Sequence, residues 1–385
     1  MAEWKECTIA DIGTVVGGAT PSTKKSENYE GGTIAWITPK DLSMFSGRYI
    51  KCGERNITKE GLNSCSAQLL PANTVLFSSR APIGYVAIAA NEVCTNQGFK
   101  SIIPNEDTDS LFLYYLLKYN KENIENMGSG TTFKEVSGNT MKGIRVKVPK
   151  SIEDQRKIAS ILGTIDDKIE ENEKINNNLE QQAQAIFQSW FIEFDPFGKK
   201  QPSEWQTSSL GKVSIMGAGG DKPKVVSPIK TEVCSYPIYS NGLSDEGLYG
   251  YTDAPKILDE SVTVSARGTI GFVCLRHIPY VPIVRLITLI PNKDIISAKY
   301  LYLWLKQLHI TGTGTTQQQL TVPDFQKTEI LVPSAEVVSL FTATIDPIFE
   351  KIWANQLEND RLAQIRDTLL PKLMSGELDV SSIDL

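Results

Sequence analysis

The sequence predicts an α+β fold in which two similar mixed domains are joined by two long helices, giving a pseudo-two-fold internal repeat. Short motifs occur in the same order in both halves of the chain, and each set is followed by a long helical pattern with an apolar seam. The length of 385 residues agrees, because chains of this size usually divide into two or three domains. We expect domains at 1–150 and 199–333, and helices within 151–198 and 334–385.

The first helical pattern runs from Ile158 to Phe194. Two rows of residues recur every seven positions, alternately three and four apart, which places them on one helix face. The rows are Ile158, Ile165, Asn172, Leu179 and Ile186, and Leu162, Ile169, Asn176, Ala183 and Trp190. A helix unbroken to Glu193 has a length of about 54 Å. The Asp195–Gly198 segment, with its proline and glycine, is expected to end it.

The second helical pattern starts at Ile345 and also has asparagines at its centre. Its rows are Ile345, Ile352, Asn359, Arg366 and Leu373, and Ile348, Asn355, Leu362 and Leu369. Pro347 predicts either a kink or a restart with Asp346 as N-cap, and Pro371 predicts a second disturbance. Because polar seam residues at matching depth usually fix register, we expect the two helices to pack along each other.

Six anchors, found in the same order in both halves, make a chance repeat improbable. They are Glu3–Lys5 with Glu204–Gln206, Ser79–Val86 with Ala266–Val273, Leu111–Lys118 with Tyr300–Lys306, Met127–Thr132 with Thr311–Thr316, Ile144–Pro149 with Ile330–Pro333, and the seamed helices. Residue patterns within the halves predict strands and two short helices. The strands are Thr74–Phe77, Tyr85–Ala89, Ser261–Ser265, Phe272–Leu275 and Arg285–Ile290, and the helices are Leu111–Tyr119 and Ala298–Leu308.

Composition describes a soluble globular protein, with 41% hydrophobic and 22% charged residues. Met1–Gly13 lacks a signal-peptide pattern and no apolar stretch is long enough to span a bilayer, so we expect a cytoplasmic protein without membrane contact. The six cysteines form no CxxC pair and are expected to be reduced. Two histidines, His277 and His309, lack ligand partners at metal spacing, so no metal site is expected.

Catalytic motifs are missing from the sequence, which contains no GxxxxGK, HExxH or GxSxG pattern. Gly217–Gly220 lacks the strand-to-helix context of a nucleotide loop, and Asp195–Phe197 only faintly resembles a methyltransferase tetrapeptide. We therefore expect a chain with no catalytic residues and no cofactor of its own.

Because the sequence contains no catalytic motif, we expect this chain to act in molecular recognition. The 128–134 and 312–319 loops are rich in hydroxyl and amide groups that can meet phosphates and base edges, and Arg80 and Arg267 lie at equivalent places beside tight turns. For a single loop a solvated surface is the alternative, but recurrence in both halves favours recognition. The net charge of −6 lies mainly in the helical segments, so a nucleic-acid surface must be a local patch.

In combination, several motifs resemble the DNA-specificity subunits of type I restriction–modification systems. They are Gly17–Ser22 with Ile34–Ile37, Arg156–Ala159 leading to Ser189–Pro196, and the closing Leu369–Glu377. The resemblance covers nearly the whole chain. It implies two target-recognition domains, each reading one half of a split site in double-stranded DNA, and two helices paired as an antiparallel coiled coil.

The resemblance also implies partners. Two methyltransferase subunits would dock on the helices, and restriction or translocase subunits would join through that methyltransferase core. S-adenosylmethionine, ATP and Mg are expected on those partners and not on this chain. The helix length then bounds the spacing between half-sites at roughly 16 base steps. Because the two halves differ outside the anchors, we expect a non-palindromic target.

These considerations give two sets of candidate site residues. The DNA-binding candidates are Trp36, Lys40, Ser79, Arg80, Lys100, Thr131, Thr132, Lys134, Asn241, Arg267, Thr269, Thr315, Thr316, Gln317 and Gln318. The partner-binding candidates are Trp190, Phe191, Phe194, Leu370 and Leu373, with packing inside the chain as the alternative for each. A standalone nucleic-acid-binding module and a protein-interaction scaffold remain alternative functions; steep salt dependence would favour nucleic acid.

Overall fold

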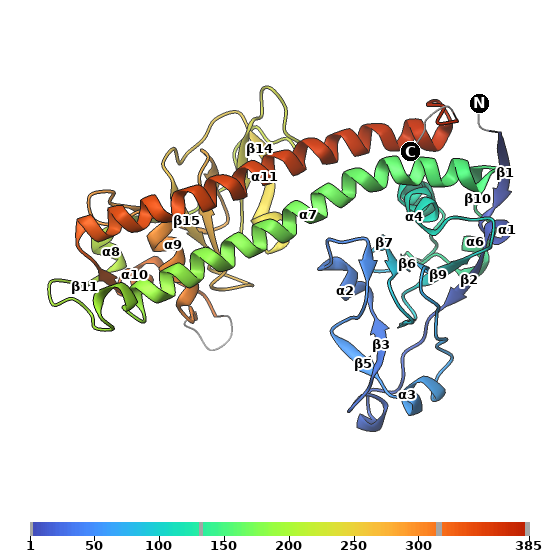
Figure 1. Ribbon diagram of the computed structural model, residues 1–385, viewed down its shortest axis with the longest axis horizontal. Helices are drawn as coiled ribbons and strands as arrows, with labels where there is room; N and C mark the ends of the chain where they lie inside the picture. The colour runs from blue at the N-terminus through green and yellow to red at the C-terminus, as the bar shows by residue number, and fades with distance from the viewer. Residues whose placement is uncertain (1–2, 131–133, 313–317, 382–385) are drawn as a thin grey trace. The chain divides into compact units, whose positions relative to one another are not determined.

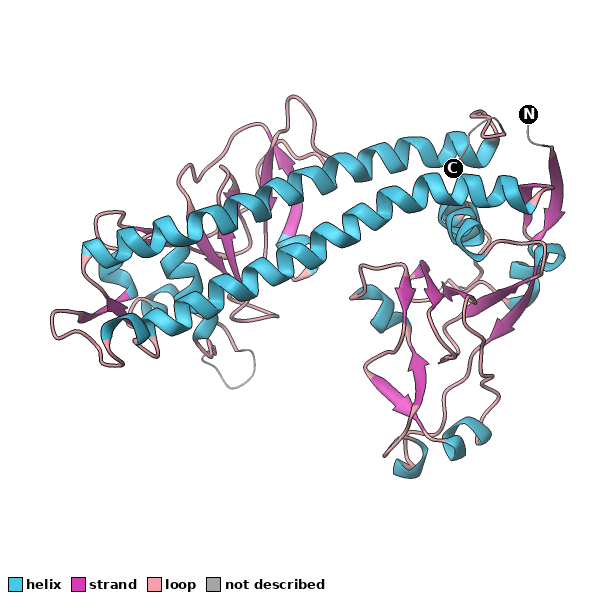
Figure 2. Ribbon diagram, viewed as in Figure 1, coloured by secondary structure: helices cyan, strands magenta, loops and turns pink. Residues whose placement is uncertain are grey.

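The computed structural model describes residues 3–130, 134–312 and 318–381. The chain divides into two compact units: the first contains residues 1–174 and 355–385, and the second contains residues 175–354. Each unit combines strands and short helices with one part of each of two long helices (Figure 1). Figure 2 shows the mixture of helix and strand in each, in agreement with the predicted α+β class.

In the described part of the first unit, the strands form three sheets, with the orders β2-β9-β6-β7-β4, β5-β3-β8 and β1-β10. All pairs are antiparallel except β4–β7 and β3–β8. The strands are β1 (Trp4–Thr8), β2 (Gly13–Gly17), β3 (Ile34–Ile37), β4 (Tyr49–Ile50), β5 (Arg55–Ile57), β6 (Val75–Ser79), β7 (Ile83–Ala89), β8 (Cys94–Thr95), β9 (Lys100–Pro104) and β10 (Arg145–Pro149). The helices are α1 (Ile9–Ile12), η1 (Ser26–Asn28), α2 (Pro39–Ser43), α3 (Lys59–Asn63), α4 (Ser110–Tyr119), α5 (Lys121–Asn126) and α6 (Gly138–Gly143).

The described part of the second unit has sheets with the orders β12-β18-β15-β16, β14-β13-β17 and β11-β19. Only β13–β17 is parallel among these pairs. The strands are β11 (Gln206–Ser209), β12 (Ser214–Ala218), β13 (Tyr236–Tyr239), β14 (Leu248–Thr252), β15 (Ser261–Val264), β16 (Val273–Arg276), β17 (Val281–Pro282), β18 (Ile287–Pro291) and β19 (Glu329–Val332). The short helices are η2 (Asp195–Phe197), α8 (Leu210–Val213), η3 (Ser244–Gly247), α9 (Ala298–Gln307) and α10 (Val322–Phe325).

The internal repeat is confirmed at the level of strand order and register. β2-β9-β6-β7 corresponds to β12-β18-β15-β16, and β5-β3-β8 corresponds to β14-β13-β17. In the parallel pairs, Trp36 lies opposite Cys94 and Ile238 lies opposite Val281. This shared register defines which residues of the two units are equivalent.

The long helices are α7 (Ile152–Phe191) and α11 (Ala335–Ser375). Helix α7 begins earlier than the seam predicted. The predicted restart at Asp346 is wrong, because α11 continues through both Pro347 and Pro371. Proline removes one backbone hydrogen bond but has a helical φ. Burial of Ile345 and Phe349 on either side of Pro347 compensates for this loss.

Within the first unit, the two long helices lie side by side and run in opposite directions. Asn172 Nδ2 donates to Asn359 Oδ1 at 2.9 Å, and Asn359 Nδ2 donates to the carbonyl of Ile169 at 3.4 Å. Earlier on α7, Asp166 pairs with Arg366, later on α11, at 2.8 Å. The asparagines that interrupt the seam therefore hydrogen-bond across it.

In the second unit, the same antiparallel pairing continues with different chemistry. Asn176 Nδ2 donates to the carbonyl of Ile352 at 3.3 Å. Near the end of α7, Phe191 lies against Phe341 of α11, with ring centroids 4.8 Å apart. Phe187 and Tyr300 complete this buried aromatic cluster. The apolar ends of the seams thus form part of the core of this unit.

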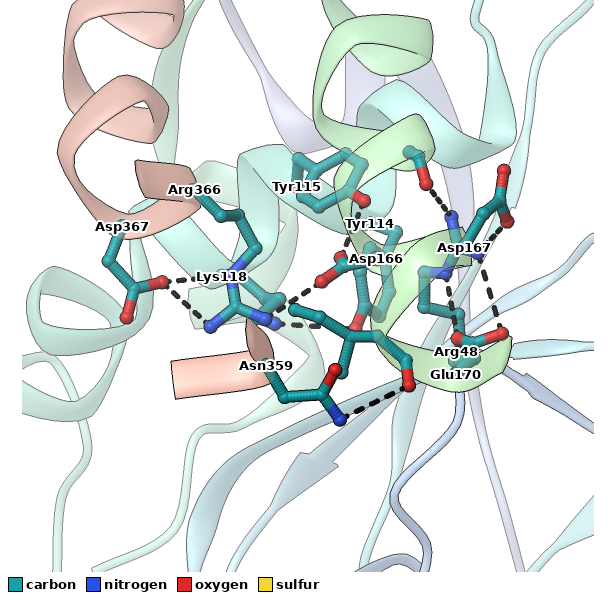
Figure 3. Close-up of polar contacts among 12 residues, drawn as sticks. Arg48, Tyr114, Tyr115, Lys118, Asp166, Asp167, Glu170, Asn359, Arg366 and Asp367 are labelled. Atoms are coloured by element: carbon teal, nitrogen blue, oxygen red, sulfur yellow. Dashed lines mark hydrogen bonds and ion pairs between the residues drawn. The ribbon is translucent and has the colours of Figure 1, made fainter. Parts of the chain in front are cut away.

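A buried ionic network attaches the strand β4 region of the first unit to α7 (Figure 3). Arg48, which is almost fully buried, donates from Nε to Glu170 Oε1 at 2.9 Å, and it also pairs with Asp167. Burial alone would lower the pKa of Arg48, but the bonds to Glu170 and Asp167 raise it above its ordinary value. Arg48 therefore stays charged and holds the domain on the helix.

Candidate functional site

The first unit presents Arg80 on the turn between β6 and β7. Ser78 Oγ fixes this turn, since it donates to the carbonyl of Pro82 at 2.8 Å and accepts from the Tyr85 N–H at 2.8 Å. Ala81 and Gly84 adopt left-handed conformations, with φ of 49° and 100°. The Arg80 side chain, about one-third exposed, therefore projects from a rigid backbone.

Glu135 occupies the space between two cations of the first unit. Its carboxylate lies 3.5 Å from Arg80 Nη1 and 3.3 Å from Lys100 Nζ. Backbone pairing fixes its place, because the Val136 N–H donates to the Ser79 carbonyl at 3.0 Å. All three charged groups are partly buried, so solvent screens their attraction incompletely. The single carboxylate of Glu135 therefore offsets one of the two positive charges at this turn.

The second unit repeats the turn around Arg267, between β15 and β16. Gly268 and Gly271 take the left-handed positions of Ala81 and Gly84, with φ of 70° and 84°. A Cβ on Gly271 would lie 2.9 Å from the carbonyl oxygen of Ile310, so this position needs glycine. The exposed Arg267 donates from Nη2 to Gln319 Oε1 at 2.8 Å.

Gln319 is the counterpart of Glu135. In each unit the residue that follows donates its N–H to the carbonyl of the residue just before the arginine: Val136 to Ser79 at 3.0 Å, and Leu320 to Ala266 at 3.0 Å. The same position thus carries a carboxylate in the first unit and a neutral amide in the second. Lys100 corresponds to Ile287, which is buried. The two arginine turns share two left-handed positions and one backbone hydrogen bond but differ in charge.

Asn241 supports the second turn from inside. Its Oδ1 accepts from the Ala266 N–H at 2.8 Å, and its Nδ2 donates to the Val284 carbonyl at 2.6 Å. The side-chain amide, predicted to contact DNA, is therefore used to connect two segments of the unit.

Other predicted DNA-binding residues divide into three groups. Trp36 and Ser79 are 6% and 0% exposed, and donate to the carbonyls of Ala19 and Gly98, so the structure makes them supports instead of surface contacts. The exposed candidates are Lys40, which pairs with Glu54 at 2.8 Å, and Lys134, Thr269 and Gln318. The candidates outside the described residues are Thr131, Thr132, Thr315, Thr316 and Gln317.

The predicted partner-binding residues are also divided by burial. Phe191 and Leu373 are 1% and 2% exposed and belong to the cores of the second and first units. They are therefore not available to a partner. Trp190, Phe194 and Leu370 are only partly buried and pack on the edges of the same cores. These three retain surface that a partner can cover.

Two residues that contact the arginines, Glu135 and Gln319, were not among the individual candidates from the sequence, although Gln319 lies in the 312–319 loop expected to act in recognition. Both residues lie at the same distance after the Met127–Thr132 and Thr311–Thr316 anchors, so the repeat already aligns Glu135 with Gln319, and the backbone hydrogen bonds of the following residues agree. Lys134 and Gln318, their immediate neighbours, were the nearest residues that composition identified.

The described residues contain no group of three or more His, Cys, Asp and Glu side chains arranged to hold a metal ion. No helix in that part of the chain is both long and apolar enough to cross a membrane. The arrangement of a partly exposed and an exposed arginine beside carboxylate and amide side chains is suited to recognising a polar, anionic surface.

Comparison with known proteins identifies the family. The chain matches the type I restriction modification DNA specificity domain twice, over residues 1–181 and 202–366. The MjaIX specificity subunit of Methanocaldococcus jannaschii is 35% identical, over 99% of this chain and 95% of that protein. The HindI specificity subunit of Haemophilus influenzae is 25% identical, over 98% and 100% of the two chains.

A solved structure agrees at the level of fold. The S subunit of a type I restriction–modification system from M. genitalium has a TM-score of 0.58 and 17% identity, and the match covers 97% of this chain and 96% of that chain. The two arginine turns fall one in each of the two matched family domains. The chain therefore belongs to the family of type I restriction–modification specificity subunits, and its role in such a system is DNA recognition.

Proposed function

We propose that this chain reads a bipartite, non-palindromic DNA site, with one half-site bound at each arginine turn. The observation that carries the proposal is the repeated turn itself, in which Arg80 and Arg267 project from equivalent backbones. The neighbouring side chains differ, since Glu135 stands where the second unit has Gln319. Equivalent scaffolds with different polar groups favour two different half-sites.

The chemistry of each turn suits base edges in the major groove. A guanidinium can donate two bonds to guanine, a glutamine amide matches adenine, and a carboxylate accepts from cytosine. Arg267, with a neutral neighbour, is ready to donate its remaining N–H groups. Arg80 must share its charge with Glu135 at 3.5 Å. We expect the second unit to contribute more of the electrostatic attraction.

The long helices would act as a ruler between half-sites. We propose recognition domains at 1–150 and 199–333 and an antiparallel coiled coil made by 151–198 and 334–385. The hydrogen bonds of Asn172 and Asn176 support this, because they fix one register of the pairing. The 40 residues of α7 span about 60 Å, which bounds the spacing at roughly 18 base steps. Inserting one heptad in both helices should lengthen the gap and leave the bases unchanged.

Methyltransferase subunits are the proposed partners. Trp190, Phe194 and Leu370, which keep exposed surface, are the candidate contacts. S-adenosylmethionine, ATP and Mg would be bound by the methyltransferase and restriction subunits, so that the catalytic groups are carried by other chains. The names of the two relatives, both specificity subunits of type I restriction enzymes, support such an assembly.

Methylation-sensitive sequencing tests the proposal. DNA from cells that express this chain with its methyltransferase should carry one modified, bipartite, non-palindromic motif. Replacing residues 1–150 with those of another family member should change one half of the motif and leave the second half and the gap unchanged. A palindromic motif, or a change in both halves, would contradict the modular assignment.

A further inference from the structure

A second exposed arginine lies beside the turn of the second unit. The sequence predicted that a strand begins at Arg285, but β18 begins at Ile287, because Val284 and Arg285 have φ of 51° and 61°. A left-handed conformation is rare for a β-branched residue such as valine, and such strained positions occur often at ligand-binding sites. Arg285 is therefore held in an unusual and specific position.

Backbone hydrogen bonds maintain this strained pair. The Val284 N–H donates to the Gly220 carbonyl at 2.9 Å, and the Arg285 N–H donates to the Gly219 carbonyl at 3.0 Å. A Cβ on Gly219 would lie 2.8 Å from the Ile283 nitrogen, so the approach of the two segments requires glycine there. The conformation at Arg285 is determined by its surroundings.

Asn241 connects Arg285 to Arg267. One end of its amide accepts from Ala266, the residue before Arg267, and the other end donates to Val284, the residue before Arg285. The two bonds, 2.8 Å and 2.6 Å, bring the two backbones within reach of a single amide group. Both arginines thus leave adjacent, braced segments.

The first unit lacks this second arginine. Its register makes Gly98 the counterpart of Arg285 and Pro39 the counterpart of Asn241. There the Ser79 N–H donates directly to the Gly98 carbonyl at 2.7 Å. A Cβ on Gly98 would lie 2.9 Å from Pro39 Cγ, so a side chain at this position would be crowded. The asparagine bridge and the arginine beyond it are features of the second unit alone.

Arg285 has no carboxylate partner in the part of the chain that the structure describes, and neither has Arg267. The third arginine of the unit, Arg276, is buried and pairs with Glu246 at 2.8 Å. An exposed guanidinium on a rigid backbone is well suited to bidentate binding of phosphate or guanine.

We propose that Arg285 binds DNA together with Arg267, and that Asn241 is the positioning residue that sets the two arginines side by side. This inference rests on the proposed function and makes it more specific: the second half-site is bound by two guanidinium groups. The group recognised is an anionic or acceptor-rich DNA surface, either a phosphate or the guanine edge.

The test uses the full chain in complex with its methyltransferase and a duplex carrying the sequenced target. Arg285→Gln should weaken binding about 10-fold. If the contact is to phosphate, the salt slope should fall by about one; if it is to guanine, one position of the second half-site should become degenerate. Lys293→Gln, which removes an exposed cation paired with Asp259, is the control and should bind like wild type.

Arg267→Gln, measured in parallel, separates the specific role of Arg285 from the assignment of this turn to DNA recognition. Wild-type affinity, salt slope and methylation motif in Arg285→Gln, with weaker binding in Arg267→Gln, would overturn the role of Arg285 alone. If neither variant altered binding or the motif, the assignment of this turn to DNA recognition would fail as well. Unchanged thermal stability of Arg285→Gln would verify that folding is intact.

Asn241→Ala tests the positioning role. If Asn241 acts through Arg285, this substitution should weaken DNA binding less in the Arg285→Gln background than in wild type. A full and additive effect in both backgrounds would show that Asn241 does not act through Arg285. Thermal unfolding of the single variant measures any separate contribution to stability.

Discussion

The two arginine turns share two left-handed positions and differ in the polar side chains around the arginine. Glu135 lies between Arg80 and Lys100, whereas Gln319 accepts a single bond from Arg267. A carboxylate at a surface that binds DNA repels the phosphates and pairs with the neighbouring cation. A neutral amide does not repel the phosphates and does not neutralise the cation. If the two turns bind DNA as proposed, affinity and selectivity should be distributed unequally between the two half-sites.

The two units also differ in how the rest of each unit is attached to the long helices. In the first, Arg48, Glu170 and Asp167 join the recognition domain to α7 by ionic hydrogen bonds (Figure 3). In the second, Phe187 and Phe341 form part of an aromatic cluster with α9. An ionic attachment depends on the charge and position of each partner, whereas an aromatic cluster depends on the volume that its rings fill. The attachment of the first unit should therefore be the more sensitive to removal of a single charge.

The largest expected effect comes from making the second turn resemble the first. Gln319→Glu places a carboxylate beside Arg267 and should weaken DNA binding about 100-fold, or about 2.8 kcal/mol, by pairing with the arginine and repelling phosphate. Fluorescence anisotropy with the target duplex measures the change. Gln326→Glu, an exposed residue of the same unit, is the control for added negative charge. Equal losses in both variants would contradict a specific role for Gln319.

A smaller effect is expected from the ionic attachment of the first unit. Glu170→Gln keeps the shape of the side chain but leaves Arg48, which is 3% exposed, with Asp167 as its remaining carboxylate partner. The free energy of unfolding should fall by about 2 kcal/mol, because a buried charge loses its best partner. Urea unfolding of the full chain measures this change.

Glu153→Gln supplies the matched control for that measurement. Glu153 pairs with Arg156 on the exposed face of the same helix, at 2.7 Å, and such surface pairs contribute little. A loss of less than about 0.5 kcal/mol is expected. If Glu170→Gln were equally mild, the ionic network would not be what attaches the first domain.

The reverse exchange at the turns should have a moderate effect in the opposite direction. Glu135→Gln releases Arg80 and Lys100 and should strengthen DNA binding about 10-fold, with a salt slope steeper by one to two. The second half of the methylation motif should stay unchanged. Weaker binding with a new base at one position of the first half would instead identify Glu135 as a base contact.

Much of the architecture could be predicted from the sequence because it rests on periodic or repeated signals. The seams located both long helices, and Asn172 and Asn359 at matching depth do hydrogen-bond to each other. Pro347 shows where local rules fail: its helix-breaking tendency is overcome by burial of the adjacent apolar face. Tertiary packing of that kind cannot be predicted from a local sequence pattern.

The site was less accessible to sequence reasoning. The repeat identified Arg80 and Arg267, since both lie in anchors. Trp36 was a predicted DNA contact, but its side chain packs with Ile57 and Cys94 and is buried. Arg285 looked like the first residue of a strand, and only its positive φ separates it from β18. Whether a residue supports the turn from within or is exposed at its surface depends on backbone conformation, which amino-acid composition does not encode.

The smallest expected effect is a dependence of stability on pH that arises from the second unit. Both histidines of the chain, His277 and His309, belong to the second unit. Burial, together with Lys299 and Arg276, lowers the pKa of His277 to about 4, below its ordinary value near 6.5. The folded chain then binds the proton less readily than the unfolded chain, so the associated stability is full above pH 6.5 and is lost as the pH falls toward 4. Since the ring stacks on Trp353 but is exposed to solvent, which screens these interactions, we expect a loss of no more than about 1 kcal/mol. Thermal unfolding between pH 7 and 4.5 should show this loss in the wild type and a smaller one in His277→Gln, whereas identical pH profiles would show that His277 does not contribute to the acid sensitivity of the second unit.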